Sequence, residues 1–181
     1  MPACIPVRKA QMNLKDYIRD IPDFPQPGIL FRDITPLLAS PTAFDQAVAG
    51  LVAACREPDF DIVVAVESRG FIFGAPLARE LGKPLAPVRK AGKLPADTHS
   101  VAYELEYGSN ILEIHTDAIA PGQRALIVDD LLAVGGTLSA ASRLVEACGG
   151  EVTRLAVLIE LAFLDGRSQL KGRDVVSLIQ Y

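Results

Sequence analysis

The feature that most limits the possible folds is a pair of short, uninterrupted apolar runs. They lie in the segments 61–66 (DIVVAV) and 124–130 (RALIVDD), and neither alternates apolar with polar residues. Runs of this kind are typical of parallel strands that are covered on both faces. Segments with helical spacing follow both runs, which indicates βαβ units with right-handed crossovers. The sequence therefore predicts an α/β protein with a mostly parallel, twisted sheet flanked by helices.

Other segments extend this pattern. A short amphipathic helix is expected over 12–21, and a stiff loop with little regular structure over 23–38, which contains three prolines and a glycine. Ser40-Pro41 predicts the start of a helix, and another helix is expected over 70–81, ending at Gly82. A further helix should follow 124–130 and close at Gly149-Gly150. Further strands are expected over 84–90, 151–161 and 174–181, with a strand–turn–strand unit at 99–115.

Composition and charge exclude several classes of protein. The chain has 181 residues and a net charge of −4, so we expect a single domain and no general binding of nucleic acid or membrane surfaces. No apolar run has the length of about 18 residues that a membrane span needs, and the first residues do not resemble a signal peptide. The three cysteines are scattered and form no cluster with histidine. We therefore expect reduced thiols, a cytoplasmic protein and no structural zinc.

Two adjacent carboxylates, Asp129 and Asp130, follow the second apolar run and precede a glycine turn, 133–137 (AVGGT). Ligands of open α/β sheets bind beyond the carboxyl ends of the strands. Glycines in the turn let the backbone approach a ligand closely, and the helix that follows offers free N–H groups to an anion such as phosphate. The carboxylates suit ribose hydroxyls or a hydrated Mg²⁺. A sugar phosphate with a metal ion is therefore a coherent ligand, whereas the simpler interpretation is an acidic turn that caps a helix.

Other phosphate-binding signatures are missing from the sequence. No GxxxxGK[ST] motif occurs, and no GxGxxG motif follows a strand. A P-loop nucleotide hydrolase and a dinucleotide-binding fold are therefore not expected.

The stretch 128–137 (VDDLLAVGGT) resembles the donor-binding signature of the type I phosphoribosyltransferases. Further segments resemble the members of that family that act on adenine, in the same order along the chain: 23–38, 67–74 (ESRGFIFG), 89–95 (RKAGKLP), 103–108 (YELEYG) and 177–181 (SLIQY). The resemblance implies transfer of phosphoribose from 5-phosphoribosyl 1-pyrophosphate (PRPP) to adenine, giving AMP and pyrophosphate. It also implies Mg²⁺ carried mainly by PRPP, a homodimer, an N-terminal hood of about residues 1–40 that contributes the base pocket, and a lid at about residues 90–110.

The resemblance also implies roles for particular residues. PRPP would be bound by Asp129, Asp130, Ala133, Val134, Gly135, Gly136 and Thr137, and its pyrophosphate by Ser68, Arg69, Arg89, Lys90 and Lys93. Glu106 would be the catalytic acid–base residue near N7 of adenine, and Tyr107 would close over the ribose. Leu30, Phe31 and Arg32 would hold adenine, with Phe31 stacked on the base. A strained, non-proline cis peptide is implied between Glu67 and Ser68, and no residue is implied as a direct metal ligand.

Simpler interpretations stay open for several of these residues. Arg69 can form a surface salt bridge, the lysines can be solvated charges, and Arg89 can act at a subunit interface. Glu106 can lie with Glu104 on the exposed face of a hairpin, and Phe31 can be a core residue.

The family's phosphate turn usually has threonine where this chain has Val134, which removes one possible hydrogen-bond donor to the 5′-phosphate. The same fold acting on another base, or a PRPP sensor without catalysis, are the competing functions. Segment 28–33 (GILFRD) argues against another base, and the absence of a spare DNA-binding segment argues against the sensor.

Overall fold

The computed structural model describes residues 12–104 and 109–181. The chain divides into two compact units, one within residues 1–47 and one comprising residues 48–181.

The N-terminal unit is built around a small antiparallel sheet. A 3₁₀ helix, η1 (Leu14–Tyr17), precedes strand β1 (Arg19–Ile21), which pairs with β2 (Phe31–Asp33). Helix α1 (Thr35–Ala39) follows β2. The helix expected over 12–21 was therefore wrong beyond a single 3₁₀ turn, and the loop expected over 23–38 was wrong at both β2 and α1.

Asp33 explains why regular structure forms in this proline-rich segment. Its buried carboxylate accepts hydrogen bonds from the Thr35 N–H at 2.9 Å, the Thr35 hydroxyl at 2.7 Å and the Arg19 guanidinium at 2.6 Å. Pro36 falls in the first turn of α1, where a missing N–H costs nothing. The remaining prolines of the segment, Pro25 and Pro27, lie in the connection between the two strands.

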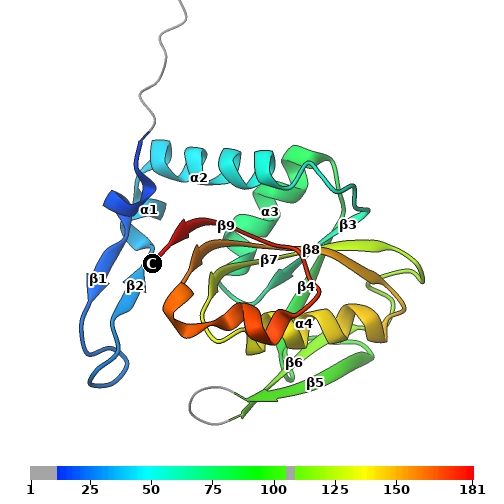
Figure 1. The fold of residues 1–181 in the computed structure, drawn as a ribbon. Coiled ribbons are helices and arrows are strands. Elements are labelled where there is room, and N and C mark those ends of the chain that lie inside the picture. The colour runs from blue at the N-terminus through cyan, green and yellow to red at the C-terminus, as the bar shows by residue number, and fades with distance from the viewer. Residues whose placement is uncertain (1–11, 105–108) are drawn as a thin grey trace, which may run out of the picture. The chain divides into compact units, whose positions relative to one another are not determined.

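Helix α2 (Pro41–Ala54) begins where Ser40-Pro41 predicts it, and the Ser40 hydroxyl accepts a hydrogen bond from the Ala43 N–H at 3.3 Å. The larger unit then continues as a seven-stranded sheet in the order β5-β6-β4-β3-β7-β8-β9 (Figure 1). Its strands are β3 (Ile62–Val66), β4 (Leu85–Lys90), β5 (Thr98–Glu104), β6 (Ser109–His115), β7 (Arg124–Leu132), β8 (Glu151–Glu160) and β9 (Val175–Gln180).

Strands β3, β4, β7, β8 and β9 pair in parallel, and the β5–β6 hairpin joins β4 in antiparallel fashion. The predicted fold class, an α/β protein with a mostly parallel sheet, is confirmed.

Helices α3 (Gly70–Leu81) and α4 (Gly136–Ala147) cover opposite faces of this sheet (Figure 1). Every residue of β3 is buried, and successive side chains point to alternate faces. Val64 and Ile127 belong to the core cluster that includes Leu144 of α4, whereas Ala65 faces Gly74 of α3. Helix α3 ends at Gly82 as predicted, because Gly82 adopts the left-handed conformation with φ of 63°.

Strand β7 is longer than predicted. The apolar run ends at Val128, yet the strand continues through Asp129 and Asp130 to Leu132. The reason is the neighbouring strand: Leu131 and Leu132 pair with Ile159 and Glu160 of β8. The two aspartates are therefore part of the sheet and not of the turn that follows it.

Two 3₁₀ helices that were not predicted, η2 (Ala162–Leu164) and η3 (Gly166–Leu170), connect β8 to β9. Glu160, which is 4% exposed, anchors this connection. Its carboxylate accepts hydrogen bonds from Arg167 Nε at 2.6 Å and Nη2 at 2.8 Å, from the Ser177 hydroxyl at 2.7 Å, and from Gln180 Nε2 at 3.1 Å. The hydrogen bonds from Arg167, the largest influence, help to lower the pKa of Glu160 from 4.5 to about 2.

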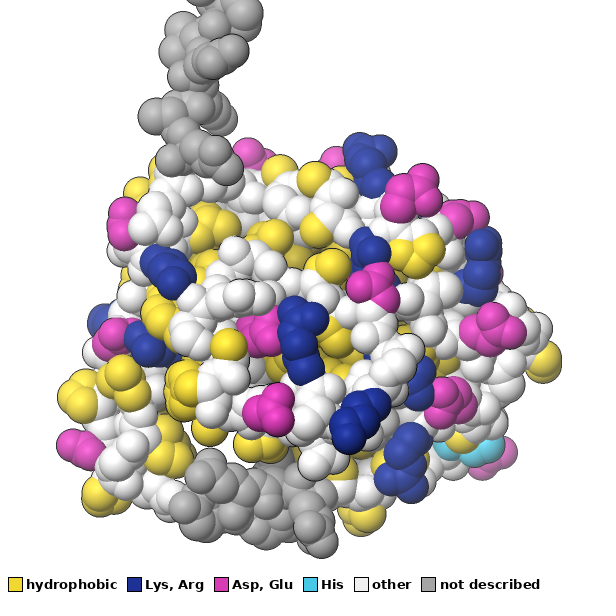
Figure 2. All heavy atoms as spheres, viewed as in Figure 1, with side chains coloured by type: hydrophobic (Ala, Val, Ile, Leu, Met, Phe, Trp, Pro, Cys, Tyr) yellow, Lys and Arg dark blue, Asp and Glu magenta, His cyan; other side chains and the backbone are white. Residues whose placement is uncertain are grey.

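Figure 2 shows Lys and Arg side chains interspersed with Asp and Glu side chains over the face that it presents. Across residues 12–104 and 109–181, no helix combines the length and the apolar character that crossing a membrane requires.

Two glycine-to-alanine substitutions test the packing of the helices. A Cβ at Gly74 would lie 2.6 Å from the Ala65 Cβ, an atom fixed to the backbone of β3, so we expect Gly74→Ala to lower the free energy of unfolding by about 1–3 kcal/mol. Gly50→Ala is the matched control, because the nearest atom is the Leu178 Cδ1, which can move, and alanine favours a helix by up to about 1 kcal/mol. Urea unfolding of both variants measures the difference, and a Gly74→Ala protein as stable as Gly50→Ala would contradict the packing described.

The Glu160 network makes the free energy of unfolding depend on pH. Because folding lowers the pKa of Glu160 to about 2, its stabilisation is complete above about pH 4.5 and is lost as the pH falls toward 2. Between about pH 6 and pH 3, the wild-type protein should lose about 2 kcal/mol more of its unfolding free energy than Glu160→Gln. Urea unfolding at the two pH values measures this difference, and equal losses would show that Glu160 does not titrate in this way.

Candidate active site

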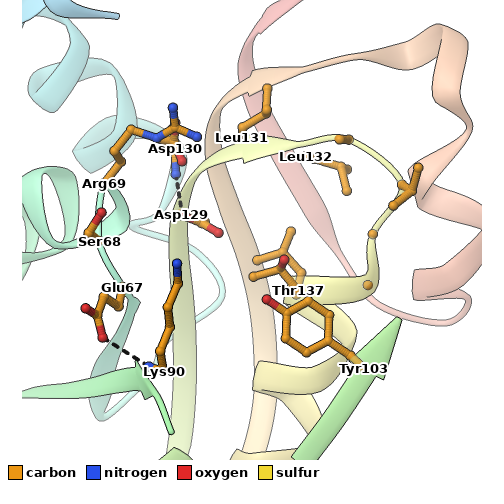
Figure 3. Close-up of a pocket in the computed structure, with 15 residues that line it drawn as sticks. Glu67, Ser68, Arg69, Lys90, Tyr103, Asp129, Asp130, Leu131, Leu132 and Thr137 are labelled. Atoms are coloured by element: carbon orange, nitrogen blue, oxygen red, sulfur yellow. Dashed lines mark hydrogen bonds and ion pairs between the residues drawn. The ribbon is translucent and has the colours of Figure 1, made fainter. Parts of the chain in front are cut away.

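A cavity of about 430 Å³ opens where the carboxyl ends of β3, β4 and β7 meet the start of α4 (Figure 3). Two chain segments and two further residues line it. These are residues 67–69 and 129–138, with Lys90 of β4 and Tyr103 of β5.

Asp129 and Asp130 lie on one wall of the cavity and are both buried, at 7% and 5% exposed. Asp129 Oδ1 accepts a hydrogen bond from the Asp130 N–H at 2.9 Å. Burial raises the pKa of both carboxyl groups, and the charge of Asp130 raises the pKa of Asp129 further. A ligand that donates hydrogen bonds or brings positive charge is therefore suited to this wall.

The loop after β3 faces the aspartates. The Arg69 guanidinium lies beside Asp130, with Nε 2.8 Å from Oδ2 (Figure 3). Close packing of α3 against β7 brings the loop to this place: a Cβ at Gly70 would lie 2.8 Å from the Val128 carbonyl oxygen. The peptide bond between Glu67 and Ser68 is cis, as the resemblance implies.

The turn 133–137 forms the opposite wall and leads into α4. Gly135 is the N-cap of the helix, with φ of 89°, a left-handed conformation that favours glycine. Glycine has no side chain that could accept from the first N–H groups of α4, so these groups and the positive end of the helix dipole remain for a ligand. With the Thr137 hydroxyl beside them, this wall is suited to a phosphate group.

Glu67 binds the basic residues at the end of β4. The Glu67 carboxylate accepts a hydrogen bond from the Lys90 N–H at 3.0 Å and one from Arg89 Nε at 3.2 Å. Burial raises the pKa of Glu67, but these two partners outweigh burial and lower it overall. The Lys90 side chain reaches the cavity, where its ammonium group can meet an anion (Figure 3).

The structure places the predicted site residues in three groups. Twelve residues were predicted around PRPP and its pyrophosphate; ten of them line this cavity: Ser68, Arg69, Lys90, Asp129, Asp130, Ala133, Val134, Gly135, Gly136 and Thr137. Arg89 and Lys93 are not among its lining residues; Arg89 pairs with Glu67 and donates to the Lys93 carbonyl oxygen at 3.0 Å. Glu106 and Tyr107 lie outside the described residues.

The residues predicted for adenine belong to the N-terminal unit. The Phe31 ring packs edge-on against Phe24, with centroids 5.2 Å apart, and Arg32 pairs with Asp20. Leu30 is 44% exposed. Their part in a base pocket stays a prediction.

Sequence reasoning missed Tyr103, Leu131, Leu132 and Leu138 as lining residues, and it gave no role to Glu67. For Tyr103 a signal exists: it lies two residues after buried Val101 in β5, so strand alternation places both on one face. No pattern in the sequence pairs Glu67 with Lys90.

Comparison with known proteins places this geometry in a family. Residues 37–177 match the phosphoribosyl transferase domain. The chain is 54% identical over 170 residues to an adenine phosphoribosyltransferase of Kosmotoga olearia, a match that covers 94% of this chain and all of that protein.

Two solved structures agree with this result. The adenine phosphoribosyltransferase of Thermoanaerobacter pseudethanolicus superposes with a TM-score of 0.91 at 55% identity, covering 93% of this chain and 98% of that one. The enzyme of Saccharomyces cerevisiae, in complex with an imino-altritol bisphosphate and adenine, gives a TM-score of 0.85 at 42% identity, covering 91% and 96% of the two chains. This chain therefore belongs to the phosphoribosyltransferase family, and within it to the adenine phosphoribosyltransferases.

Proposed function

We propose that this protein transfers the phosphoribosyl group of PRPP to adenine, giving AMP and pyrophosphate, in purine salvage. The observation that carries the proposal is that a glycine turn at a helix N-terminus, a buried aspartate pair and two cationic side chains line one cavity. Relatives that share more than half of their residues with this chain are adenine phosphoribosyltransferases.

The turn 133–137 binds the 5′-phosphate of PRPP in this proposal. The N–H groups at the start of α4 donate to the phosphate oxygens, and the Thr137 hydroxyl adds a further donor. The ribose then lies over β7, where its hydroxyl groups donate to Asp129 and Asp130. These contacts orient the sugar so that C1 faces the acceptor base.

The pyrophosphate leaves toward the β3 loop. The bond between C1 and the pyrophosphate oxygen breaks with its electron pair on oxygen, and positive charge develops on the ribose. Ser68, Arg69 and Lys90 lie where they can stabilise the departing anion, and Arg69 must exchange part of its contact with Asp130 for the phosphate oxygens. Arg89 and Lys93 are proposed to assist at the rim of the same subsite.

Adenine completes the reaction by forming the bond between its N9 and C1 and losing the N9 proton. Glu106 is proposed as the general acid–base residue near N7 of adenine, which assists the base in losing its proton. Tyr107 is proposed as the residue that closes over the ribose. Leu30, Phe31 and Arg32 are proposed to hold the base. A backbone carbonyl in that segment would accept from the amino group of adenine and would repel the carbonyl oxygen of hypoxanthine or guanine.

Mg²⁺ is proposed as a companion of PRPP, held by its pyrophosphate and ribose oxygens. The residues of the cavity fit this arrangement better than a dedicated protein site: Asp130 already pairs with Arg69, and burial favours the neutral form of Asp129. Within residues 12–104 and 109–181, no group of three or more His, Cys, Asp or Glu residues is arranged to hold a metal ion. The ion would neutralise charge on the leaving pyrophosphate, and the aspartates would reach it through water or ribose.

The resemblance further supports a homodimer located in the cytoplasm, without a nucleic-acid or membrane partner. Light scattering of the purified protein tests the dimer, and a monomer at working concentration would contradict it.

A panel of bases tests the proposed function. Purified protein is incubated with PRPP, Mg²⁺ and adenine, hypoxanthine, guanine or xanthine, and the nucleotides are separated by chromatography. We expect AMP from adenine alone, because among the four bases only adenine carries an amino group at C6, where the others carry a carbonyl oxygen that the proposed backbone carbonyl would repel. Formation of a different nucleotide would agree with the proposed PRPP site but contradict the proposed adenine pocket. Binding of PRPP without formation of any nucleotide would favour a PRPP sensor without catalysis.

Two pairs of aspartates provide the matched control for this panel. Asp129→Asn/Asp130→Asn should abolish AMP formation, because the ribose hydroxyls lose both carboxyl groups that accept their hydrogen bonds. Asp59→Asn/Asp61→Asn changes a second pair, near the other end of β7, where both residues bind Arg124. This variant should retain AMP formation, since the pair lies outside the cavity lining.

Val134 offers a test of the phosphate turn. Val134→Thr adds a hydroxyl to a turn residue that lines the cavity, and a hydrogen bond to a charged group contributes about 1.5–3 kcal/mol. We expect a lower KM for PRPP, whereas Val134→Ala, which adds no donor, should not lower it. Steady-state kinetics with PRPP varied at saturating adenine measures the effect, and an unchanged or raised KM in the threonine variant would argue against a missing contact.

A further inference from the structure

The phosphate turn packs directly against the connection between β8 and β9, backbone against backbone. A Cβ at Gly135 would lie 2.4 Å from the Gly166 carbonyl oxygen, and a Cβ at Gly166 would lie 2.1 Å from the Ala133 carbonyl oxygen. The two segments therefore meet at glycines on both sides. A shift of η3 is therefore expected to displace the turn, because the nearest atom at each glycine is a backbone carbonyl oxygen of the other segment.

An ion pair outside the cavity determines where η3 lies. Arg167, the second residue of η3, forms a two-pronged contact with Glu160, at 2.6 and 2.8 Å. Arg167 Nη1 also donates to the Val175 carbonyl oxygen of β9 at 3.1 Å. Glu160 in turn is bound by Ser177 and Gln180 of β9. The planar fork of an arginine defines both distance and orientation in such a pair.

The other contacts of the segment do not replace this one. The Leu161 N–H donates to the Leu132 carbonyl oxygen at 2.9 Å, and Leu170 is buried in the core. These contacts hold the two ends of the connection. Between them, Arg167 is the residue that ties the middle of the segment to the sheet through its side chain.

We propose that Glu160 and Arg167 are positioning residues for the binding of the PRPP 5′-phosphate. Neither lines the cavity, so neither touches the substrate. They act through η3, whose backbone supports the turn that donates to the phosphate. This inference rests on the proposed function, because it assigns the 5′-phosphate to that turn.

Inhibition by the two halves of PRPP tests the inference. Ribose 5-phosphate reports the turn, and pyrophosphate reports the subsite at the end of β3, so the two inhibition constants separate a local effect from a general one. In Arg167→Met we expect the KM for PRPP and the inhibition constant of ribose 5-phosphate to rise about tenfold, because a small displacement of a binding group is costly. The inhibition constant of pyrophosphate and the KM for adenine should change less than about twofold, with kcat largely retained.

Arg173→Met is the matched control. Arg173 also forms an arginine–glutamate pair of 2.6 Å, with Glu146 in the last turn of α4, far along the helix from the phosphate turn. This variant should leave all four constants unchanged. Arg167→Lys restores the charge without the fork and should lie between Arg167→Met and the wild type.

A second variant reaches the same turn without breaking the ion pair. Gly166→Ala places a Cβ against the Ala133 carbonyl oxygen and should raise the same two constants. Ser168→Ala, in the same 3₁₀ helix, removes only a hydrogen bond to the Asp165 carbonyl oxygen and should have no effect. Ser177→Ala, which removes one partner of Glu160, serves as the milder change if Arg167→Met does not fold.

The outcomes distinguish this inference from the proposed function. A wild-type protein that neither binds PRPP nor forms AMP would overturn both. The positioning role alone would be overturned if the wild-type protein forms AMP but Arg167→Met raises neither the KM for PRPP nor the inhibition constant of ribose 5-phosphate. It would also be overturned if Arg167→Met raises the inhibition constants of ribose 5-phosphate and pyrophosphate equally. A selective rise for ribose 5-phosphate supports it.

Discussion

Strand β7 is paired in parallel on both sides, with β3 and with β8, and the arrangement of the site depends on this double pairing. Both faces of the strand are covered, so its apolar side chains are buried and its carboxyl end emerges at a defined place. The aspartates lie on the strand itself, the β3 loop approaches from one neighbour, and the segment after β8 supports the turn from the other. The positions of the aspartates, the β3 loop and the phosphate turn therefore all depend on β7.

The unfavourable free energy of burying two adjacent carboxyl groups influences which ligands the cavity can bind. Burial raises the pKa of both Asp129 and Asp130, and Arg69 offsets this only in part. A ligand with hydroxyl donors and an associated cation would stabilise the ionised carboxylates, whereas an anion without them would repel the carboxylates. The electrostatics of the cavity therefore favour a sugar phosphate in which hydroxyl groups separate the phosphate groups from the aspartates.

Much of the fold could be predicted because its strands and helices are marked locally. The apolar run of β3, the stop at Gly82 and the start at Ser40-Pro41 are each contiguous signals. The missed elements depend on particular side-chain contacts: β2 and α1 form around Asp33 and its bonds to Arg19 and Thr35, and η3 forms around Glu160 and Arg167. Periodicity does not record such contacts.

The same distinction applies to the cavity. The residues in the continuous turn, and Ser68 and Arg69 in the β3 loop, could be recognised from their order along the chain. Tyr103 lies in an antiparallel hairpin, and the Glu67 carboxylate accepts a hydrogen bond from the N–H of Lys90 in a neighbouring strand. Lys93 is not among the residues that line the cavity, so its role at the pyrophosphate subsite stays a prediction.

The contact between Gly135 and Gly166 has a consequence for how sequences of this kind can change. The two positions are 31 residues apart, yet the space for a side chain at either is occupied by the other segment's backbone. No substitution at one glycine can be compensated by a smaller residue at the other, because glycine is already the smallest. Both positions are therefore restricted to glycine. The connection between β8 and β9 can become longer or shorter only if the change preserves this backbone contact.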